Sequence, residues 1–264
     1  MPSIVEGSCG TTNYPLRIVA RLDVKTSNVI KGIRMEGLRV VGLPNELALR
    51  YYLQGADELL FIDSVASLYG RGTLFDVVRS CADQMFIPMT MGGGLQNLAD
   101  VSKALRSGAD KVAVNSHAVK RPMFIREIAE QYGSQCAVLS VHCKRKSSGG
   151  WEVMIDYGRE HSGMDVLDWI EEAVTLGVGE ILLTSVDNDG TRLGFDQELA
   201  MSVSKVTDIP IVLSGGYGNL AHITQNLVDH LSGITVGSEL HYNRVTVSEL
   251  RSRCKSLGAN VREA

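Results

Sequence analysis

Two glycine-rich motifs stand at matching places in the two halves of this chain. MGGGL occupies residues 91–95 and LSGGYG occupies residues 213–218, so that Gly93 and Gly215 are separated by 122 residues in a chain of 264. A motif that recurs at so long an offset predicts a fold built from two similar halves.

Two further pairs of motifs keep nearly the same offset. VAVNS at 112–116 corresponds to ITVGS at 234–238, again 122 residues apart, and the segment around Asp23 corresponds to the segment around His142 at an offset of 119. A doubly wound open sheet does not predict a near-constant offset. Two half-barrels of about four strand–helix units each do predict it.

Short apolar runs alternate with longer amphipathic runs along the chain, which predicts strands connected by helices. Helical patterns occupy 98–108 and 166–177, and glycines typical of left-handed helix ends occur at Gly55, Gly108 and Gly177. Buried strands that alternate with helices build a parallel sheet. We therefore predict an α/β fold, a (β/α)8 TIM barrel with a two-fold internal half-barrel repeat. Its eight strands are expected at 17–23, 58–63, 85–91, 111–115, 136–142, 180–185, 210–214 and 233–237.

Composition narrows the class of protein. The chain is 44% hydrophobic, and its net charge of −4 favours neither nucleic acid nor a membrane surface as a partner. No apolar run approaches the roughly 20 residues of a membrane span, and no signal peptide is recognisable. The five cysteines form no CxxC pair, which favours reduced thiols in a cytoplasmic protein. We expect residues 1–14 to form an irregular extension and residues 15–264 a single barrel domain.

The carboxyl ends of the strands hold the catalytic residues of such barrels. There, GGGL and SGGYG place bare backbone N–H groups at the start of a helix, where phosphate can bind. Either run alone could simply form a tight turn. Two runs at matched positions, each followed one strand later by a serine-containing turn, predict two phosphate sites on opposite sides of the mouth. The expected residues are Gly93, Gly94, Asn115 and Ser116 on one side, and Ser214, Gly215, Gly216, Gly237 and Ser238 on the other.

Polar residues at other strand ends are candidates for chemistry or substrate contact. Asp23 could transfer a proton if partial burial raised its pKa, or could instead pair with Lys31. Asp187 and Thr191 could contact substrate hydroxyls, whereas Asp189–Gly190 has the chemistry of a turn. Further candidates for substrate binding are Lys31, Asp63, Thr184 and Gly190. No cluster of His, Asp or Glu has the spacing of metal ligands, and no cofactor is expected.

The motifs together resemble one enzyme family. RIVARLDVK, MGGGL, GADKVAVNS, GEILLTSVDNDGT and VLSGGYG are similar to the cyclase subunit of imidazole glycerol phosphate synthase, and the similarity runs from about Arg17 to the end of the chain. The isomerase that acts one step earlier in histidine biosynthesis shares the barrel and both phosphate sites. LDVK and ILLTS, however, resemble the cyclase.

This resemblance implies a lyase that forms part of a glutamine amidotransferase complex. Such a cyclase receives ammonia from a separate glutaminase subunit, with which it forms a heterodimer. It uses the ammonia to split a bisphosphorylated ribulosyl-aminoimidazole and to close an imidazole ring. Two carboxylates, at the ends of strands 1 and 5, act as the general acid and base. Asp23 matches the first of them, and the position of the second holds His142.

The resemblance also implies an ammonia gate at the floor of the barrel, made of two basic and two acidic residues. The matching positions hold Arg17, Glu58, Lys111 and Glu180, and Asp110 matches a residue that faces the glutaminase. Alternating charges joined by salt bridges would close the lower entrance while leaving a narrow path. The same four residues could instead form a floor kept for stability alone.

With a histidine at position 142 in place of the second carboxylate, the sequence is compatible with more than one activity. Imidazole can transfer protons, but it is neutral or cationic where a carboxylate would stabilise positive charge. The alternative is a divergent paralogue that channels ammonia for amination of a surface-glycan nucleotide sugar, without cyclase activity. A sugar-phosphate isomerase would also need a working group at this position, so His142 weakens that hypothesis equally. The segment KRKSSGGW at 144–151 is expected to be a lengthened loop that grips phosphate, contacts a partner or is solvated surface.

Overall fold

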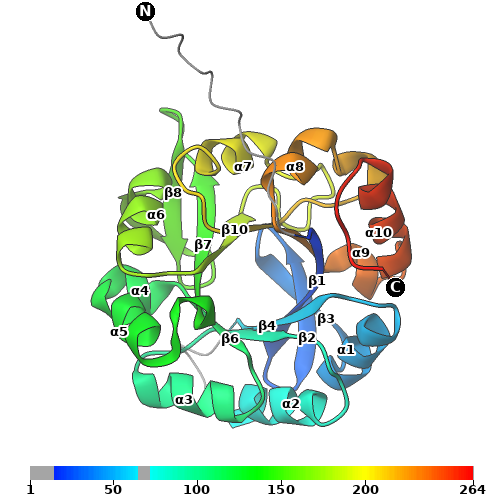
Figure 1. The fold of residues 1–264 in the computed structure, drawn as a ribbon, viewed down its shortest axis with the longest axis horizontal. Coiled ribbons are helices and arrows are strands. Elements are labelled where there is room, and N and C mark those ends of the chain that lie inside the picture. The colour runs from blue at the N-terminus through cyan, green and yellow to red at the C-terminus, as the bar shows by residue number, and fades with distance from the viewer. Residues whose placement is uncertain (1–14, 65–71, 264) are drawn as a thin grey trace, which may run out of the picture.

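The computed structural model describes residues 15–64 and 72–263, so the expected N-terminal extension lies outside the described residues. Within them, parallel strands form a closed barrel, because each pairs with the next and β12 pairs with β1 (Figure 1). The (β/α)8 barrel predicted from the sequence is confirmed. Its strands are β1 (Arg17–Lys25), β4 (Glu58–Asp63), β5 (Met89–Gly92), β6 (Lys111–Val114), β7 (Ala137–Arg145), β10 (Glu180–Ser185), β11 (Ile211–Ser214) and β12 (Gly233–Val236).

Helices surround the barrel and cover the outer faces of its strands (Figure 1). Gly55, Gly108 and Gly177 follow three of them with φ values of 85°, 102° and 97°, as a left-handed helix end requires. The described helices are α1 (Pro44–Leu53), α2 (Gly72–Ala82), α3 (Leu98–Arg106), α4 (Ser116–Lys120), α5 (Met123–Tyr132), α6 (Val166–Thr175), α7 (Gln197–Val203), α8 (Gln225–His230), α9 (Ser238–His241) and α10 (Val247–Ser256).

The apolar core has two parts, because successive side chains of a strand point to opposite faces. The larger part lies between the strands and the helices and includes Phe61, Phe124 and Trp169. The smaller part fills the inside of the barrel and consists of Val19, Leu60, Ile62, Ala113, Val138, Leu182 and Val212. It separates a charged floor at the amino ends of the strands from a polar mouth at their carboxyl ends.

Two hairpins that were not expected from the sequence extend the barrel at equivalent places. β2 (Asn28–Ile33) and β3 (Glu36–Gly42) follow β1, and β8 (Trp151–Ile155) and β9 (Glu160–Asp165) follow β7. Their turns use left-handed backbone at Arg34–Met35 and at 156–158. These turns lack the Asn-Gly or Asp-Gly signal from which hairpins are usually recognised. Their matching positions agree with the half-barrel repeat.

The segment 144–151, expected to be a lengthened loop, is the turn of a hairpin together with the strand residues on either side of it. β7 continues to Arg145 and pairs there with Trp151 at the start of β8. Lys146 forms an ion pair with Asp165 at 2.7 Å, and Arg145 lies over the Trp151 ring and pairs with Glu198 at 2.9 Å. These two cations are thus engaged by acidic side chains of the protein, which gives no support to a phosphate grip.

One strand is shorter than expected. The run 85–91 was expected to be a strand, but β5 begins at Met89, where it pairs with Leu59. Pro88 lacks the N–H that would continue the ladder, and Phe86 is 83% exposed. The apolar run therefore covers a strand together with part of the loop before it.

Candidate active site

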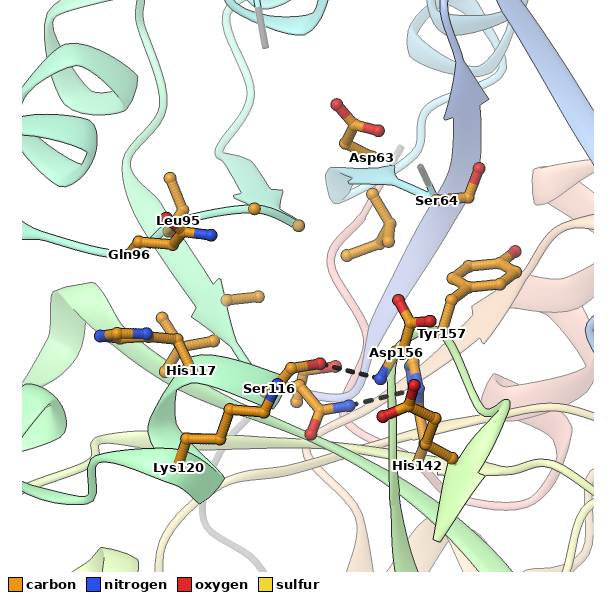
Figure 2. A pocket seen from close by; sticks show the side chains of 18 residues that line it. Asp63, Ser64, Leu95, Gln96, Ser116, His117, Lys120, His142, Asp156 and Tyr157 are labelled. Carbon is orange, nitrogen blue, oxygen red and sulfur yellow. Dashed lines mark hydrogen bonds between the residues drawn. The ribbon is translucent and has the colours of Figure 1, made fainter. Parts of the chain in front are cut away.

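The carboxyl ends of the strands enclose a cavity of about 350 Å³, which we call the first cavity (Figure 2). Figure 2 shows Gln96 and His117 on one side of it and Tyr157 on the other. Six of the site residues predicted from the sequence line this cavity: Asp63, Gly93, Gly94, Asn115, Ser116 and His142.

A second cavity of only about 20 Å³ lies at the other half of the mouth. Seven predicted residues line it: Lys31, Gly190, Ser214, Gly215, Gly216, Gly237 and Ser238. Arg21 and Asp189 also line it, and neither was predicted as a site residue. The structure thus divides the predicted phosphate-binding residues between two cavities, each containing one glycine turn and one serine turn.

The glycines of the two phosphate turns are required by close backbone contacts. Gly93 and Gly215 both have a φ of +94°. A Cβ atom at Gly93 would lie 2.3 Å from the carbonyl oxygen of Asp63, and one at Gly215 would lie 2.7 Å from that of Ser185. Both turns therefore exclude any side chain at the place where a phosphate is predicted to bind.

Asp23 is buried at the end of β1 between two cations. Its Oδ1 accepts a hydrogen bond from Arg21 Nε at 3.0 Å, and Lys31 Nζ lies 3.8 Å from Oδ2. Burial alone would raise the pKa of this carboxyl, but Arg21 and Lys31 outweigh burial and lower it. The raised pKa that the sequence suggested is therefore wrong. Asp23 is ionised at neutral pH and can accept a proton.

Asp189 is part of this charged cluster, so its interpretation as turn chemistry alone was incomplete. Lys31 Nζ donates to both of its carboxylate oxygens at 2.8 Å. Asp189 is buried, and Gly190 beside it has a φ of +71°. A Cβ atom at Gly190 would lie 2.2 Å from the carbonyl oxygen of Gly32, so the loop after β10 packs tightly on the β2–β3 hairpin.

His142 is buried at the end of β7, across the mouth from Asp23. Burial lowers the pKa of its imidazole to about 3, and the nearby Arg21 acts in the same direction. The ring is therefore neutral at pH 7. Its Nδ1 lies 3.3 Å from Asn115 Nδ2, which also donates to the carbonyl oxygen of Met154 at 3.1 Å.

The contact with Met154 fixes the tautomer of His142. A carbonyl oxygen only accepts, so the nitrogen of the Asn115 amide must face Met154 and, with it, His142 Nδ1. Nδ1 is then an acceptor, and the single ring proton is on Nε2. His142 is therefore a neutral hydrogen-bond donor through Nε2, whereas the carboxylate expected at this position would be an anionic acceptor.

Tyr157 was not predicted from the sequence, although it lines the first cavity. It has a φ of 56° at the tip of the β8–β9 hairpin, and its ring meets the His142 ring edge-on at 6.1 Å between centroids. Burial and the Asp23 carboxylate raise the pKa of its hydroxyl well above the usual value. The backbone N–H of Asp156 donates to Ser116 Oγ at 2.9 Å, which ties the hairpin tip to a predicted phosphate turn.

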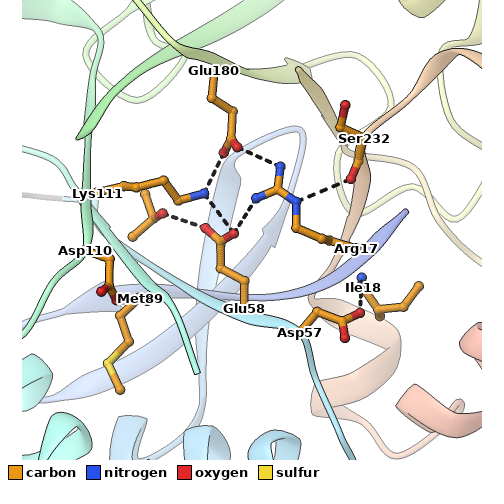
Figure 3. A network of polar contacts seen from close by, with 10 residues as sticks. Arg17, Ile18, Asp57, Glu58, Met89, Asp110, Lys111, Glu180 and Ser232 are labelled. Atoms are coloured by element: carbon orange, nitrogen blue, oxygen red, sulfur yellow. Dashed lines mark hydrogen bonds and ion pairs between the residues drawn. The ribbon is translucent and has the colours of Figure 1, made fainter. Parts of the chain in front are cut away.

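At the floor, the four predicted gate residues form a closed ring of ion pairs (Figure 3). Arg17 contacts Glu58 at 2.7 Å and Glu180 at 2.6 Å, and Lys111 contacts the same two carboxylates at 2.8 Å and 2.9 Å. Each charge thus has two partners of opposite sign. Asp110 is exposed beside Lys111, where its Oδ2 accepts from the Met89 N–H at 2.8 Å.

A family model described as "Histidine biosynthesis protein" matches residues 17–246. The chain belongs to this family. Among similar proteins, the "Imidazole glycerol phosphate synthase subunit HisF" of Legionella pneumophila is 56% identical over 78% of this chain and 97% of its own. Subunits of the same name from Synechococcus sp. and Streptococcus mutans are 45% and 43% identical over 94% and 93% of this chain, and 98% of theirs. The resemblance to the cyclase subunit is thereby confirmed.

Three predicted substrate-binding residues of this histidine biosynthesis family member line neither cavity. Thr184 Oγ1 accepts from Arg21 Nη1 at 3.1 Å. Asp187 Oδ2 accepts from the backbone N–H of Arg145 at 2.8 Å, and Thr191 Oγ1 donates to the carbonyl oxygen of Asn188 at 2.7 Å. The contacts of Asp187 and Thr191 are thus local ones that hold loops, and their role with substrate stays a prediction.

Across residues 15–64 and 72–263, no group of three or more His, Cys, Asp and Glu side chains is arranged to hold a metal ion. No described helix has the length and apolar character to cross a membrane.

Proposed function

We propose that this chain is the cyclase subunit of an imidazole glycerol phosphate synthase. It takes ammonia from a glutaminase subunit and uses it to cleave and cyclise a bisphosphorylated ribulosyl-aminoimidazole in histidine biosynthesis. The observation that carries this proposal is the combination of two glycine turns at the mouth with a closed ring of charges at the floor of one barrel.

The mouth fits a substrate with a phosphate at each end. In the proposal, one phosphate binds over Gly93 and Gly94 with Asn115 and Ser116, and the other over the turns of the second cavity. Asp23 lines neither cavity but contacts Arg21 and Lys31, which line the second and hold its carboxylate ionised. An ionised carboxylate at this place can take a proton from the ammonia-derived nitrogen as it attacks.

The floor fits the delivery of ammonia from a partner. In the proposal, the glutaminase subunit docks beneath the barrel and contacts Asp110, and the ring around Glu58 acts as the gate. The ring must open before a molecule passes, since each of its four charged side chains forms two ion pairs. Such a ring keeps bulk water out of the barrel while the partner is inactive. We place the complex in the cytoplasm, with no nucleic acid or membrane partner.

His142 changes the proton chemistry without removing it. A neutral imidazole with its proton on Nε2 donates a hydrogen bond, so it can stabilise negative charge on a substrate oxygen. It cannot neutralise a cationic intermediate as a carboxylate would. We therefore assign base chemistry to Asp23 and hydrogen-bond donation to His142. The names of the relatives give no support to the alternative of sugar amination, and we do not retain it as a second function.

The test is turnover of the bisphosphorylated ribulosyl-aminoimidazole by the purified protein in excess ammonium salt, with no glutaminase present. We expect turnover that is lost in Asp23→Asn and retained in the control Asp208→Asn, which changes an exposed carboxylate before β11. Glutamine should replace ammonium only when a glutaminase subunit is added. Tight binding of the substrate with no turnover by the unaltered protein would refute the cyclase activity and leave only the binding sites.

A further inference from the structure

Arg21 is a buried cation at the centre of the mouth. It lies two residues before Asp23 on β1, so both side chains point into the barrel. Its guanidinium spans the interior: Nε donates to Asp23 Oδ1 at 3.0 Å, and Nη1 donates to Thr184 Oγ1 at 3.1 Å and to Ser214 Oγ at 3.0 Å. It therefore contacts three strands at once.

These contacts leave two of its N–H groups unused. A guanidinium has five N–H donors, and the three bonds above account for Nε and both hydrogens of Nη1. Within the described residues, Nη2 makes no hydrogen bond. Nη2 is not completely buried and keeps a small solvent-accessible surface. Arg21 as a whole is 3% exposed, and the cavity that it lines is the second one.

The surroundings of Nη2 are those of an anion site. The second cavity is lined by the glycines of two turns and by the hydroxyl-bearing residues Ser214 and Ser238. The other buried cation of this cavity, Lys31, is engaged by both oxygens of Asp189. Nη2 has two N–H groups free to donate, and charge-assisted hydrogen bonds from a guanidinium to phosphate oxygens are among the strong ones in proteins.

We propose that Arg21 binds the substrate phosphate in the second cavity through Nη2 while its Nε holds the Asp23 carboxylate in position. One side chain would then join substrate binding to the placement of the base. The inference rests on the proposed function for the identity of the substrate, but the phosphate contact itself can be tested without turnover.

The experiment is a titration of the full chain with inorganic phosphate, followed by nuclear magnetic resonance of backbone amides. The amide of Gly94 reports the first cavity, and that of Gly216 reports the second. Arg21→Met should weaken phosphate binding at Gly216 by about tenfold or more, the usual size for a lost hydrogen bond to a charged group, and leave binding at Gly94 unchanged. Arg244→Met, which removes an arginine paired with Glu239 outside both cavities, is the matched control.

Arg21→Met leaves Asp23 with one cation fewer and can fail to fold. Arg21→Lys keeps the charge but lacks the Nη2 donors, and it should bind phosphate at Gly216 more weakly than the unaltered chain. Equal affinity at Gly216 in the unaltered chain and in a folded Arg21 variant would overturn the inference. So would an equal loss at Gly94 and Gly216, because that is the signature of a general structural defect.

Turnover then separates this inference from the proposed function. If the unaltered chain has no cyclase activity but Arg21→Met loses phosphate only at Gly216, the phosphate contact stands and the cyclase assignment fails. If the unaltered chain is active and Arg21→Met binds phosphate at Gly216 as tightly as the unaltered chain does, the cyclase assignment stands and the phosphate contact fails. In an active chain, Arg21→Met should also move the acid limb of the pH–rate profile to higher pH, since Asp23 would lose the donor that favours its charged form.

Discussion

Asp23 and His142 occupy equivalent places in the two half-barrels, yet one is charged and the other is not. Each stands near the end of a strand that runs on into a hairpin, and each is almost completely buried. Asp23 is ionised because Arg21 and Lys31 outweigh the cost of burial. His142 faces an amide and a tyrosine ring, and burial keeps it neutral. Equivalent positions in a repeated fold can therefore acquire opposite proton chemistry from their neighbours.

The two cavities differ in size. The first has about 350 Å³ of space and four charged residues in its lining, Asp63, Lys120, Asp156 and Glu160, whereas the second has about 20 Å³ and contains Arg21, Lys31 and Asp189. The β2–β3 hairpin supplies Lys31 and packs on the loop after β10, which narrows the second cavity. The second half of the mouth is thus narrowed by a hairpin that the Lys31–Asp189 ion pair joins to the loop after β10.

The largest expected effect compares Asp23→Asn with His142→Asn. Ammonia-driven turnover should fall about 10³-fold in Asp23→Asn, within the usual range for loss of an acid or base. In His142→Asn the fall should be about tenfold at most, because a neutral donor is replaced by another neutral donor. Steady-state kinetics of the two variants side by side measures the difference. Equal losses would show that His142 works as a base and that its neutral character does not decide its role.

The next effect concerns stability, and it contrasts one lysine from each cavity. Lys31→Met leaves the buried Asp189 without the cation that contacts both of its carboxylate oxygens, and we expect a loss of about 3–5 kcal/mol in the free energy of unfolding. Lys120 lines the first cavity and its side chain is exposed. Lys120→Met should lower the free energy of unfolding by less than about 0.5 kcal/mol. Urea unfolding of both variants checks this. A small loss in Lys31→Met would mean that water reaches Asp189 freely.

Much of this site could be predicted from the sequence, because strand ends and glycine turns have local signals. The turns at Gly93 and Gly215 and the gate residues follow from strand periodicity, the repeat and the family resemblance. Arg21 was missed although alternation along β1 places it on the same face as Asp23. The burial and pairing that give it a role involve Thr184 and Ser214, which are 163 and 193 residues away. Tyr157 was missed because its hairpin turn has no recognisable signal.

A third prediction restores the expected carboxylate. His142→Asp would place a second carboxyl group close to Arg21, and this cation favours the ionised form of the new aspartate. If the cyclase chemistry uses two carboxylates, ammonia-driven turnover should rise by about tenfold or more, within the range of acid–base catalysis. The matched control is His142→Asn, which has the same size without the charge. A fall in turnover below that of His142→Asn would indicate a reaction adapted to the neutral imidazole.

The last effect is a pH dependence of stability. The pKa of His142 is about 3 in the folded protein and about 6.5 when the chain is unfolded, so between these values the unfolded chain binds more protons. The stability from the neutral ring is therefore complete above pH 6.5 and falls as the pH decreases, by about 2 kcal/mol between pH 6.5 and 5. His241, whose pKa burial also lowers to about 3, adds a similar slope. Urea unfolding of His142→Asn across this interval should show the slope reduced by one histidine. An unchanged slope in His142→Asn would mean that the imidazole binds as many protons in the folded chain as in the unfolded chain, so that burial does not lower its pKa. The charge difference from Asp23 would then fail as the explanation of their different roles.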